Sequence, residues 1–438
     1  MMKQIQGFSK LSKQDKIEWL ATHFFQNADL AKQTLMQYWN SNQQLQQLHD
    51  EFTENTISNL YIPFGVAPNF LIDGQFYSLP MAIEESSVVA AASNAAKFWQ
   101  SRGGFKTEII GTEKVGQIHF TFNGQADFLF SQFNSLKQSL IETANEVSAN
   151  MIKRGGGLTT IDLIDKTDAL ENYYQIHACF ETLDAMGANY INSCLEAMAK
   201  LWENELNAAL ANSTHKLEVV MSILSNYVPN CLVKAQVSCP VSALAKDQDK
   251  AKQYAQKFVQ AVQIAQVEPY RAVTHNKGIM NGIDALVLAT GNDFRAVEAG
   301  VHAYASRTGT YRSLSDARIE NDEFIFEMTL PLALGTVGGL TKLHPLVKLA
   351  LEMLGNPNAQ ELMRIAAVCG LAQNFAALNS LTTTGIQKGH MKMHLMNILN
   401  QFQATEEEKT TIAKMYENKT ISHTQVVETL NAMRDAAN

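Results

Sequence analysis

Hydrophobic and polar residues follow helical spacing at the start of the chain and strand spacing soon after it. Residues 12–50 carry apolar side chains at intervals typical of two or three short amphipathic helices, with Ser12 as the N-cap of the first. Residues 61–79 are expected to be extended, and Asp73-Gly74 predicts a hairpin turn within them. Residues 84–100 again predict a helix, which the glycines at 103 and 104 should end.

The next part of the chain, residues 115–223, has a pattern of its own. It predicts a strand at 117–122, a helix at 126–154, strands at 158–163 and 173–182, a helix at 184–212 and a strand at 217–224. This β-α-β-β-α-β order is the ferredoxin-like arrangement, so we expect a compact domain inserted into a larger one. The sequence contains no G-x-G-x-x-G motif and therefore does not support a Rossmann domain.

After the predicted insertion, strands such as 324–328 alternate with apolar helices such as 359–381. The chain then becomes more polar: residues 385–401 predict a helix, and Thr405 to Glu408 have the pattern of a capping box. This tail could hinge at Gly385 and close over a binding site as a lid. It could also be a solvated terminal bundle, which its composition slightly favours.

These segments together predict an α+β fold. A large mixed domain of helices and sheet is expected from residues 1–112 and 223–380, an inserted ferredoxin-like domain from 113–222, and a C-terminal helical segment from 381–438. The length of 438 residues exceeds what one ordinary hydrophobic core needs, which agrees with two or three domains.

Composition and charge narrow the classes of function. An apolar fraction of 46% is ample for globular folding, and a charged fraction of 18% is somewhat low. Low surface charge fits a protein that buries part of its surface in an oligomer, and it fits a large monomer as well. The net charge of −8 argues against a nucleic-acid partner but leaves room for a local basic patch that binds a phosphorylated cofactor.

The cysteines and the N-terminal residues indicate the cellular compartment. Five cysteines are present, and no two of them form a C-x-x-C pair, which argues against a disulfide framework and against a thiolate zinc site. The first residues lack the apolar core of a signal peptide, and no run approaches the roughly 20 apolar residues that span a bilayer. We therefore expect a cytoplasmic protein without a membrane anchor.

The segment from Thr274 to Gly300 carries the strongest chemical signal. Lys277 stands in a stretch rich in glycine and asparagine, which predicts a turn, then a buried strand, then a helix that opens at residues 292–295. A lysine with no neighbouring charge before Asp284 could be an electrophile that faces a substrate oxygen. A structural pair between Lys277 and a carboxylate is an equally good interpretation.

Two glutamates, Glu84 and Glu85, precede an apolar helix whose first cation is Lys97. Loss of solvent would disfavour the charged form of such a glutamate, which could then hold a proton near neutral pH. Alternatively, both glutamates only favour the helix N-terminus through the helix dipole, and the residues alone favour this second interpretation.

Two histidines, His390 and His394, are four residues apart in the predicted tail helix and therefore share one face. The glutamate of an H-E-x-x-H zinc motif is absent, and we expect no metal site. Taken alone, these residues are typical of partly exposed surface histidines.

Further candidates lie in segments with little other charge. Arg271 could bind a carboxylate through two parallel hydrogen bonds, and Asn226 and Asn374 could contact a ligand, but each could equally satisfy backbone carbonyls. Residues 184–189 (DAMGAN) should open the second helix of the inserted domain, where Gly187 would let the backbone approach a phosphate. Such small-residue helix starts are common, so the motif is weak evidence by itself.

Several segments, kept in order along nearly the whole chain, resemble the class II (bacterial) 3-hydroxy-3-methylglutaryl-CoA reductases. They are residues 54–57, 66–70, 80–93, 184–189, 275–284, 290–300, 370–374 and 385–394. The segment HNKGIMNGID matches in full, and TGNDFRAVEAG differs from the family only by Phe294 in place of Trp. Ser58 replaces the glycine of the family's ENVIG element, which leaves the detail of that element open.

The resemblance implies a coenzyme A substrate site on the large domain. Lys277 would stabilise the developing oxyanion, protonated Glu85 would donate a proton, and Asp293 would lie between them. His390, carried by the tail as a flap, would protonate the departing thiolate of coenzyme A. The implied substrate-binding residues are Ser87, Asn226, Arg271, Asn281 and Asn374.

The resemblance also implies a nicotinamide cofactor on the inserted domain. The residues that would hold it are Asp184, Ala185, Met186, Gly187, Ala188 and Asn189. Relatives that prefer NAD carry an aspartate before the Gly-Gly-Gly turn, where this chain has Ser148. Without that carboxylate a 2′-phosphate is not repelled, and Lys153 and Arg154 could supply positive charge for it. We therefore expect NADPH, with NADH as a second option.

The implied reaction is the reduction of 3-hydroxy-3-methylglutaryl-CoA to mevalonate and free coenzyme A, with two reduced nicotinamides used in sequence. The family builds its site at a dimer interface, so a homodimer or an assembly of dimers is expected. Two alternatives stay open: the same enzyme working oxidatively with NAD in mevalonate breakdown, or a coenzyme A-binding homologue without catalysis. The joint presence of Glu85, Lys277, Asp293 and His390 argues against the second, because binding alone needs no proton relay.

Overall fold

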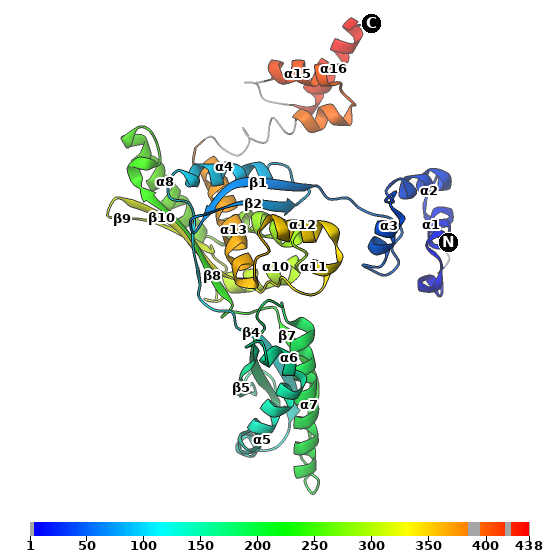
Figure 1. Cartoon of the computed structure of the whole chain (residues 1–438), viewed down its shortest axis with the longest axis vertical. Coiled ribbons are helices and arrows are strands. Elements are labelled where there is room, and N and C mark those ends of the chain that lie inside the picture. Colours follow the sequence, from blue (N-terminus) through cyan, green and yellow to red (C-terminus); the bar gives the residue numbers. More distant parts are fainter. Residues whose placement is uncertain (1–3, 384–394, 417–421, 438) are drawn as a thin grey trace. The chain divides into compact units, whose positions relative to one another are not determined.

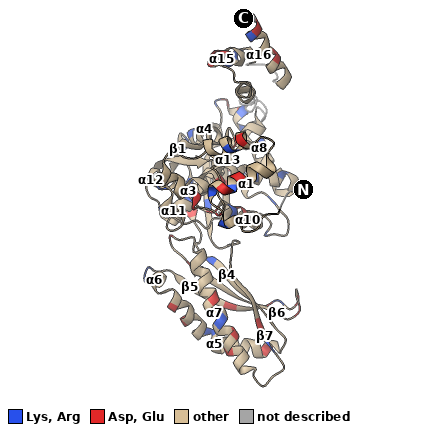
Figure 2. Ribbon diagram, turned by 90° about the vertical axis from the view of Figure 1, so that its right-hand side faces the viewer, with Lys and Arg blue, Asp and Glu red and all other residues tan. Residues whose placement is uncertain are grey.

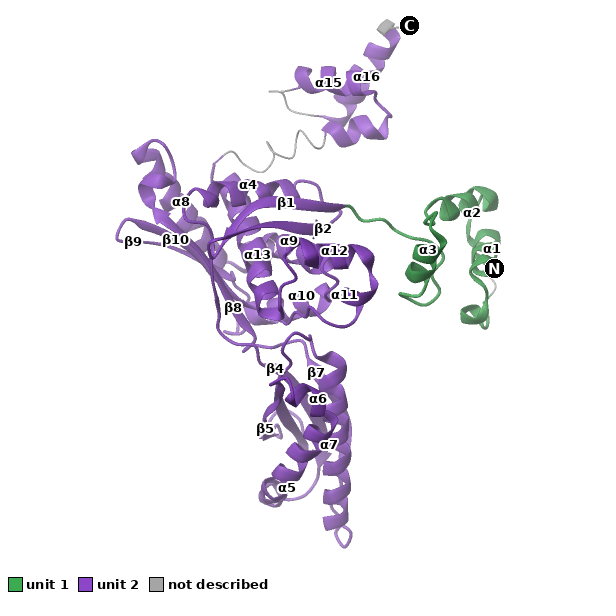
Figure 3. Cartoon of the chain, viewed as in Figure 1, with its two compact units in different colours: residues 1–63 green, residues 64–438 purple. Residues whose placement is uncertain are grey.

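The computed structural model of the chain describes residues 4–383, 395–416 and 422–437 (Figure 1). The chain forms two compact units, residues 1–63 and 64–438 (Figure 3). This division differs from the predicted domain limits, which stay a prediction. Helices and antiparallel sheets both occur, and the predicted α+β class is confirmed.

The first unit is helical, as its apolar spacing predicts. It contains α1 (Lys13–Phe24), α2 (Ala28–Gln37) and α3 (Gln43–Asp50). Ser12 caps α1, because its hydroxyl oxygen accepts a hydrogen bond from the N–H of Asp15 at 3.1 Å. An ion pair of 2.7 Å between Lys13 Nζ and Asp50 Oδ1 joins the start of α1 to the end of α3.

The second unit opens with the predicted hairpin, formed by β1 (Phe64–Ile72) and β2 (Gln75–Ala82). Asp73 and Gly74 make its turn with positive φ angles of 48° and 88°, the conformation that a two-residue hairpin turn favours. The helix that follows, α4 (Val88–Gln100), ends at the predicted glycines. A Cβ atom on Gly104 would lie 2.4 Å from the carbonyl oxygen of Leu71, so only glycine fits there.

Outside the inserted segment, four strands form an antiparallel sheet with the order β3-β8-β10-β9. Its strands are β3 (Lys106–Ile109), β8 (Leu232–Pro240), β9 (Ser315–Glu320) and β10 (Glu323–Pro331), so the strand predicted at 324–328 is confirmed. The helices of this part are α8 (Gln248–Val267), α9 (Pro269–Ala289), α10 (Phe294–Ala305), α11 (Leu340–Leu343), α12 (Pro345–Met353) and α13 (Ala359–Thr382).

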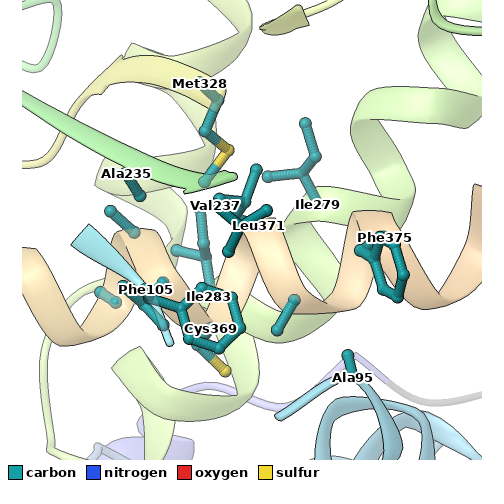
Figure 4. Packing of buried hydrophobic residues seen from close by; sticks show 14 of the residues in the cluster. Ala95, Phe105, Ala235, Val237, Ile279, Ile283, Met328, Cys369, Leu371 and Phe375 are labelled. Atoms are coloured by element: carbon teal, nitrogen blue, oxygen red, sulfur yellow. The ribbon is translucent and has the colours of Figure 1, made fainter. Parts of the chain in front are cut away.

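Helices α9 and α13 pack tightly against each other, α13 also packs against β8, β3 and β10 of this sheet, and α9 packs against β2 of the hairpin (Figure 4). A Cβ on Gly282 would lie 2.6 Å from the carbonyl oxygen of Cys369, and a Cβ on Gly370 would lie 2.8 Å from Ile283 Cγ1. Helix α13 is long and apolar enough, by length and composition only, to cross a membrane. Its most apolar stretch is 72% buried, which makes it the central helix of this hydrophobic core.

The inserted segment has the predicted β-α-β-β-α-β order. Its elements are β4 (Lys114–Phe122), α5 (Ala126–Val147), α6 (Ala149–Ile152), β5 (Gly157–Asp165), β6 (Tyr173–Glu181), α7 (Ala188–Ala209) and β7 (Leu217–Ser225). The antiparallel sheet order β5-β6-β4-β7 is the ferredoxin-like order, and the segment has a hydrophobic cluster of its own. Helix α7 carries three glutamates and one cation, Lys200 (Figure 2).

Two helix limits predicted for this segment are wrong. The helix expected at 126–154 is interrupted at Ser148, which separates α5 from α6. The helix expected from residue 184 begins at Ala188, because Gly187 adopts a left-handed φ of 94° that an α-helix does not contain. The DAMG residues therefore form a turn in front of α7 rather than its first turn.

The C-terminal segment contains helix at residues 395–401, α15 (Glu406–Met415) and α16 (His423–Ala437). The predicted capping box is confirmed: Thr405 accepts a hydrogen bond from the N–H of Glu408, and the Glu408 side chain accepts one from the N–H of Thr405. These helices share a small apolar cluster that includes Leu399, Ile412 and Val426. The predicted hinge at Gly385 and the two predicted histidines, His390 and His394, lie outside the described residues.

Candidate active site

Lys277 lies in the middle of α9, so the predicted turn and buried strand at this place are wrong. The helix begins cleanly, with Pro269 at its first position and the Glu268 carboxylate accepting hydrogen bonds from the N–H groups of Tyr270 and Arg271. Its two glycines weaken helix propensity, and Gly282 lies where the neighbouring helix α13 comes close. The helix therefore holds Lys277 on a rigid element.

The Lys277 ammonium forms an ion pair with Glu85, a residue 192 positions earlier in the chain. The Nζ atom lies 2.6 Å from Glu85 Oε2, and the two side chains are 57% and 38% exposed. The molecule thus contains the lysine–carboxylate pair that the structural interpretation of Lys277 predicted. Its partner is another of the predicted catalytic residues, which makes the functional interpretation stronger.

The predicted helix start at residue 84 is wrong, because α4 begins at Val88. Ser87 precedes it with a φ of 76°, a left-handed conformation that is uncommon outside glycine. Glu84 and Glu85 therefore lie in the turn before the helix, and no side chain caps its N-terminus. Neither glutamate belongs to the first turn of α4, and Glu85 reaches Lys277 instead.

Four predicted residues line one cleft between α4, α9 and α13. Glu85, Ser87, Lys277 and Asn281 all face this cleft, which has a volume of about 710 Å³. Lys277 and Asn281 are four residues apart on α9, so one helical turn separates them on the same face. A cleft of this size accommodates a substantial organic substrate.

Asn374, a predicted substrate contact, is instead buried in the core with 1% exposure. Its Oδ1 accepts a hydrogen bond from Ser315 Oγ at 2.8 Å, and Ser315 Oγ lies 2.7 Å from His275 Nε2. Burial, aided by the charge of Arg271, lowers the pKa of His275 to about 3. A neutral imidazole thus completes a polar network between α9, β9 and α13, and Asn374 acts as a structural member of it.

Asp293 is not found between Lys277 and Glu85 in the described chain. Its side chain caps α10, where Oδ1 accepts hydrogen bonds from the N–H groups of Arg295 and Ala296 at 3.1 and 3.2 Å. Burial acts to raise the pKa of Asp293, but the hydrogen bonds from Arg295 and Ala296 outweigh it and lower the pKa. The predicted contact with the ion pair is thus absent from these residues, and a catalytic part for Asp293 stays a prediction.

A second carboxyl pair, which the sequence analysis did not single out as a pair, joins α9 to α10. Burial and contact with Glu298 raise the pKa of Asp284, while a hydrogen bond with His302 lowers the pKa of Glu298. His302 Nδ1 in turn lies 2.7 Å from Tyr311 Oη. The spacing of four residues between Glu298 and His302 on one helix is the signal in the sequence that could have revealed this chain of contacts.

The DAMGAN segment forms a fixed turn in front of α7. The carbonyl oxygen of Asp184 accepts a hydrogen bond from Thr336 N–H at 2.8 Å, and its Oδ1 accepts one from Ala359 N–H at 3.0 Å. A Cβ on Gly187 would lie 2.5 Å from Thr182 Cγ2, so the glycine is required for both its φ angle and its surroundings. The N-terminal N–H groups of α7 have no side-chain cap.

The three residues predicted to distinguish NADPH from NADH fall into two groups. Ser148 is 1% exposed and directs its hydroxyl inward, where Oγ lies 3.0 Å from Tyr190 Oη. Lys153 and Arg154 are exposed in the turn after α6. Position 148, where the aspartate expected of NAD-preferring relatives is missing, is therefore buried. Lys153 and Arg154 are accessible to a ligand.

A model of the hydroxymethylglutaryl-coenzyme A reductase family matches residues 13–395. The chain belongs to this family. It is 37% identical over 420 residues to the 3-hydroxy-3-methylglutaryl-coenzyme A reductase of Archaeoglobus fulgidus, and the match covers 95% of this chain and 91% of that protein.

Two solved structures from Streptococcus pneumoniae agree with this assignment. One, a 3-hydroxy-3-methylglutaryl-coenzyme A reductase, has a TM-score of 0.73 and 36% identity and covers 98% of this chain and 100% of its own. The other, a class II reductase bound to NADPH in open conformations, has a TM-score of 0.71 and 37% identity and covers 87% and 100%. The predicted resemblance to class II reductases is confirmed, and the chain is an NAD(P)-dependent oxidoreductase.

Arg271 and Asn226, two further predicted residues, do not line the cleft of Lys277. Arg271 is half-buried near the start of α9, and burial lowers its pKa. Asn226 is exposed just after β7. Its carbonyl oxygen lies close to Gly300 of α10, where an added Cβ would be 2.5 Å from that oxygen. His390 lies outside the described residues. Substrate contacts by these residues stay predictions.

Proposed function

We propose that the chain reduces 3-hydroxy-3-methylglutaryl-CoA to mevalonate and free coenzyme A, with NADPH as the hydride donor. The ion pair between Lys277 and Glu85 carries this proposal, because it places a cation beside a carboxyl group in a cleft large enough for the acyl portion of the substrate. The NADPH-bound relative from Streptococcus pneumoniae, at 37% identity, supports the choice of cofactor.

Lys277 would stabilise negative charge on the substrate oxygen. Its ammonium has three donors, and the contact of 2.6 Å with Glu85 uses one of them. The others are available to the thioester carbonyl, whose oxygen becomes anionic as hydride adds to the carbon. An exposed side chain leaves room for this oxygen, and exclusion of water by the substrate would strengthen the interaction.

Glu85 would supply a proton at the same place. In the cleft its carboxyl group contacts the Lys277 ammonium. A bound substrate removes water and favours the neutral carboxyl group, which can then donate its proton to the alkoxide of the new alcohol. Ser87 and Asn281, on the walls of the same cleft, would orient the polar end of the acyl group.

The turn and first residues of α7 fit a dinucleotide. Gly187 leaves the backbone open to a phosphate, and the N-terminus of a helix of 22 residues attracts negative charge. When bound, NADPH supplies the hydride. Lys153 and Arg154 would bind its 2′-phosphate. Residue 148 is a buried serine, so no carboxylate at this position repels the phosphate.

His390 would protonate the thiolate of coenzyme A as the first reduction product collapses to the aldehyde. Residues 385–438 would close as a flap to deliver it and open for exchange of the cofactor before the second reduction. Deletion of these residues should abolish the complete reaction. If turnover of 3-hydroxy-3-methylglutaryl-CoA persisted without them, the flap would have no part in it.

We further infer a cytoplasmic homodimer, or an assembly of dimers. Helices α11 and α12 expose Leu340, Leu343, Leu346, Leu349 and Met353, each between 39% and 56%, an apolar surface that a second copy would cover. A second copy could also complete the site around Asp293. The five cysteines are unpaired thiols, which supports a reducing compartment. Light scattering on the purified chain tests the oligomeric state: a monomer at micromolar concentration would contradict this inference.

A spectrophotometric assay tests the proposed reaction. Addition of 3-hydroxy-3-methylglutaryl-CoA should start the oxidation of NADPH, with two NADPH consumed for each coenzyme A thiol released and mevalonate as the product. Parallel rates with NADH determine the cofactor preference. If acyl-CoA binds but no nicotinamide is consumed in either direction, the chain is a non-catalytic homologue and the proposal is wrong.

A further inference from the structure

The turn at residues 184–187, in front of α7, is attached to the part of its unit that lies outside the inserted segment. Asp184 makes the contacts: its carbonyl oxygen accepts a hydrogen bond from Thr336 N–H at 2.8 Å, and its Oδ1 accepts one from Ala359 N–H at 3.0 Å. Ala359 is the first residue of α13, which also lines the cleft of Lys277. The position of the turn therefore depends on residues far from it in the sequence.

The segment that receives the turn, residues 335–337, lies between β10 and α11. Gly338 and Gly339 follow it with φ angles of 87° and 52°, and a Cβ added to either would meet no atom within 4 Å. Glycines in open space leave the backbone free to change conformation, so packing does not hold this end of the segment. Gly335, its buried end, has to be held by another contact.

Asn292 supplies that contact from the link between α9 and α10. Its Oδ1 accepts a hydrogen bond from Gly335 N–H at 2.8 Å. The carbonyl and hydroxyl oxygens of Thr290 lie 3.3 and 3.4 Å from Asn292 Nδ2, which orients the amide group. Thr290 is fully buried at the end of α9. Asn292 is thus anchored to the helix that carries Lys277.

Gly335 continues this connection to the turn itself. A Cβ on Gly335 would lie 2.6 Å from the backbone nitrogen of Met186 and 3.2 Å from the carbonyl carbon of Ala185. The two backbones are therefore in direct contact, without a side chain between them. A cavity of about 20 Å³, lined by Met186 and by Val297 of α10 among others, leaves room for about one water molecule at this junction.

We propose that Asn292 is a positioning residue, which sets the place of the turn at 184–187 relative to α9. The inference rests on the proposed function and deepens it, because this turn would hold NADPH and α9 carries Lys277. Asn292 acts through Gly335 rather than on the reacting atoms. A shift of the turn would misplace the hydride donor, and a displacement of about 1 Å can slow a reaction about 100-fold.

The substitution Asn292→Leu tests the proposal, because leucine has a similar size and makes neither hydrogen bond. In the chain without cofactor, hydrogen exchange of residues 183–187 and 333–337 should become about tenfold faster. The Kd of NADPH, measured by nicotinamide fluorescence, should rise about tenfold, and kcat should fall about tenfold. The KM for 3-hydroxy-3-methylglutaryl-CoA should change less than about twofold.

Two further variants serve as controls. Asn207 makes the same kind of bridge about 28 Å further along α7, where Nδ2 donates to the carbonyl oxygen of Leu217 at 3.1 Å and Oδ1 accepts from its N–H at 3.3 Å. Asn207→Leu should lower the melting temperature to a similar extent without changing exchange at the turn or the affinity for NADPH. Asn292→Asp keeps an acceptor for Gly335 and should restore most of the protection and most of kcat.

Several results would overturn the proposal. If Asn292→Leu loses stability as Asn207→Leu does, with normal exchange at the turn, the residue is only structural. If exchange rises but NADPH affinity and kcat do not change, the place of the turn has no effect on the reaction. If the KM for the acyl-CoA rises as much as the Kd of NADPH, the substitution acts through the neighbouring Asp293.

Gly335→Ala is the second variant, and it decides the question if Asn292→Leu does not fold. Its Cβ would push against the backbone of Met186 while Asn292 stays in place, so the turn should again exchange faster and bind NADPH more weakly. Unchanged exchange and affinity would contradict the proposal. A parent chain that neither binds nor oxidises NADPH would instead refute the proposed function, because the exchange measurements need no cofactor.

Discussion

The two faces of helix α9 differ in what they contribute. On the cleft face, Lys277 is 57% exposed and reaches across to Glu85 on a separate segment. On the core face, Gly282 and Ile283 are fully buried against α13, where backbone atoms leave no space for another carbon. One face supplies charge to a substrate and the other supplies rigidity. Substitutions should therefore separate activity from stability within a single helix.

The largest effect is expected from Lys277→Ala on the cleft face. Loss of the cation that stabilises the oxyanion should lower kcat/KM by about 10³-fold, or about 4 kcal/mol. The free energy of unfolding should change by less than about 1 kcal/mol, because the ion pair with Glu85 is exposed. Steady-state assays and denaturant titrations on the same preparations measure both.

Lys257→Ala is the control for this substitution, since Lys257 is exposed on α8 and does not line the cleft. It should keep full activity. A Lys277→Ala variant with nearly normal kcat/KM would show that the cleft face has no catalytic cation. The proposed difference between the two faces of α9 would then be wrong.

Glu85→Gln should have the next largest effect. Glutamine keeps the shape and can still accept a hydrogen bond from Lys277, but it cannot deliver a proton. The reduction of mevaldehyde, assayed separately, should therefore fall by about 10²-fold, with little change in the binding of coenzyme A. Glu84→Gln, one residue away and exposed, should be neutral. Equal losses in both variants would indicate a general effect of charge rather than proton transfer.

The comparison also explains what the sequence could and could not predict. The hairpin at Asp73-Gly74 and the β-α-β-β-α-β order were correct, because turn residues and apolar periodicity are local signals. Helix α9 was predicted as a turn and a strand, because its glycines were taken as turn residues. Gly282 is required by the approach of Cys369 on α13, nearly 90 residues away in the chain, and no local sequence pattern reveals such a contact.

The candidate site shows the same division. Glu85, Ser87, Lys277 and Asn281 come together in one cleft, as the family motifs implied. Asn374 also belongs to a family motif, but α13 turns it toward His275 and Ser315 in the core. A motif gives the residue, whereas the rotation of its helix against the neighbouring elements decides whether the side chain faces a ligand or the interior.

On the core face, Gly282→Ala should destabilise the chain by about 1–3 kcal/mol. A Cβ at this place would lie 2.6 Å from the carbonyl oxygen of Cys369, and the two helices would have to move apart. Gly278→Ala is the matched control on the same helix, because its Cβ would meet nothing closer than Ala377 Cβ at 3.9 Å. The control should raise stability by up to about 1 kcal/mol. Denaturant titration of both variants tests the pair, and an equal change in stability in each would show that the close approach of Cys369 to Gly282 does not decide the outcome.

The smallest effect is a dependence of stability on pH that arises where α9 meets α10. Burial and contact with Glu298 raise the pKa of Asp284, so the folded chain keeps a proton that the unfolded chain releases near pH 4. The folded state then binds more protons, and this contribution to the free energy of unfolding falls as pH rises from about 4 to 8, by at most about 1.4 kcal/mol per pH unit. The lowered pKa of Glu298 acts in the opposite sense, but only at acidic pH, where that carboxylate becomes protonated.

Asp284→Asn should remove this dependence, because asparagine keeps a donor for Glu298 and has no proton to lose. Denaturant titrations of the parent and the variant at several pH values should give a shallower slope for the variant between pH 4 and 8. The cleft face provides the control: Glu85→Gln should leave the slope as in the parent, since Glu85 is paired with Lys277 in an open site. Parallel slopes for the parent and Asp284→Asn would mean that the carboxyl pair is hydrated, and that the core face of α9 is less dry at its C-terminal end than its packing against α13 implies.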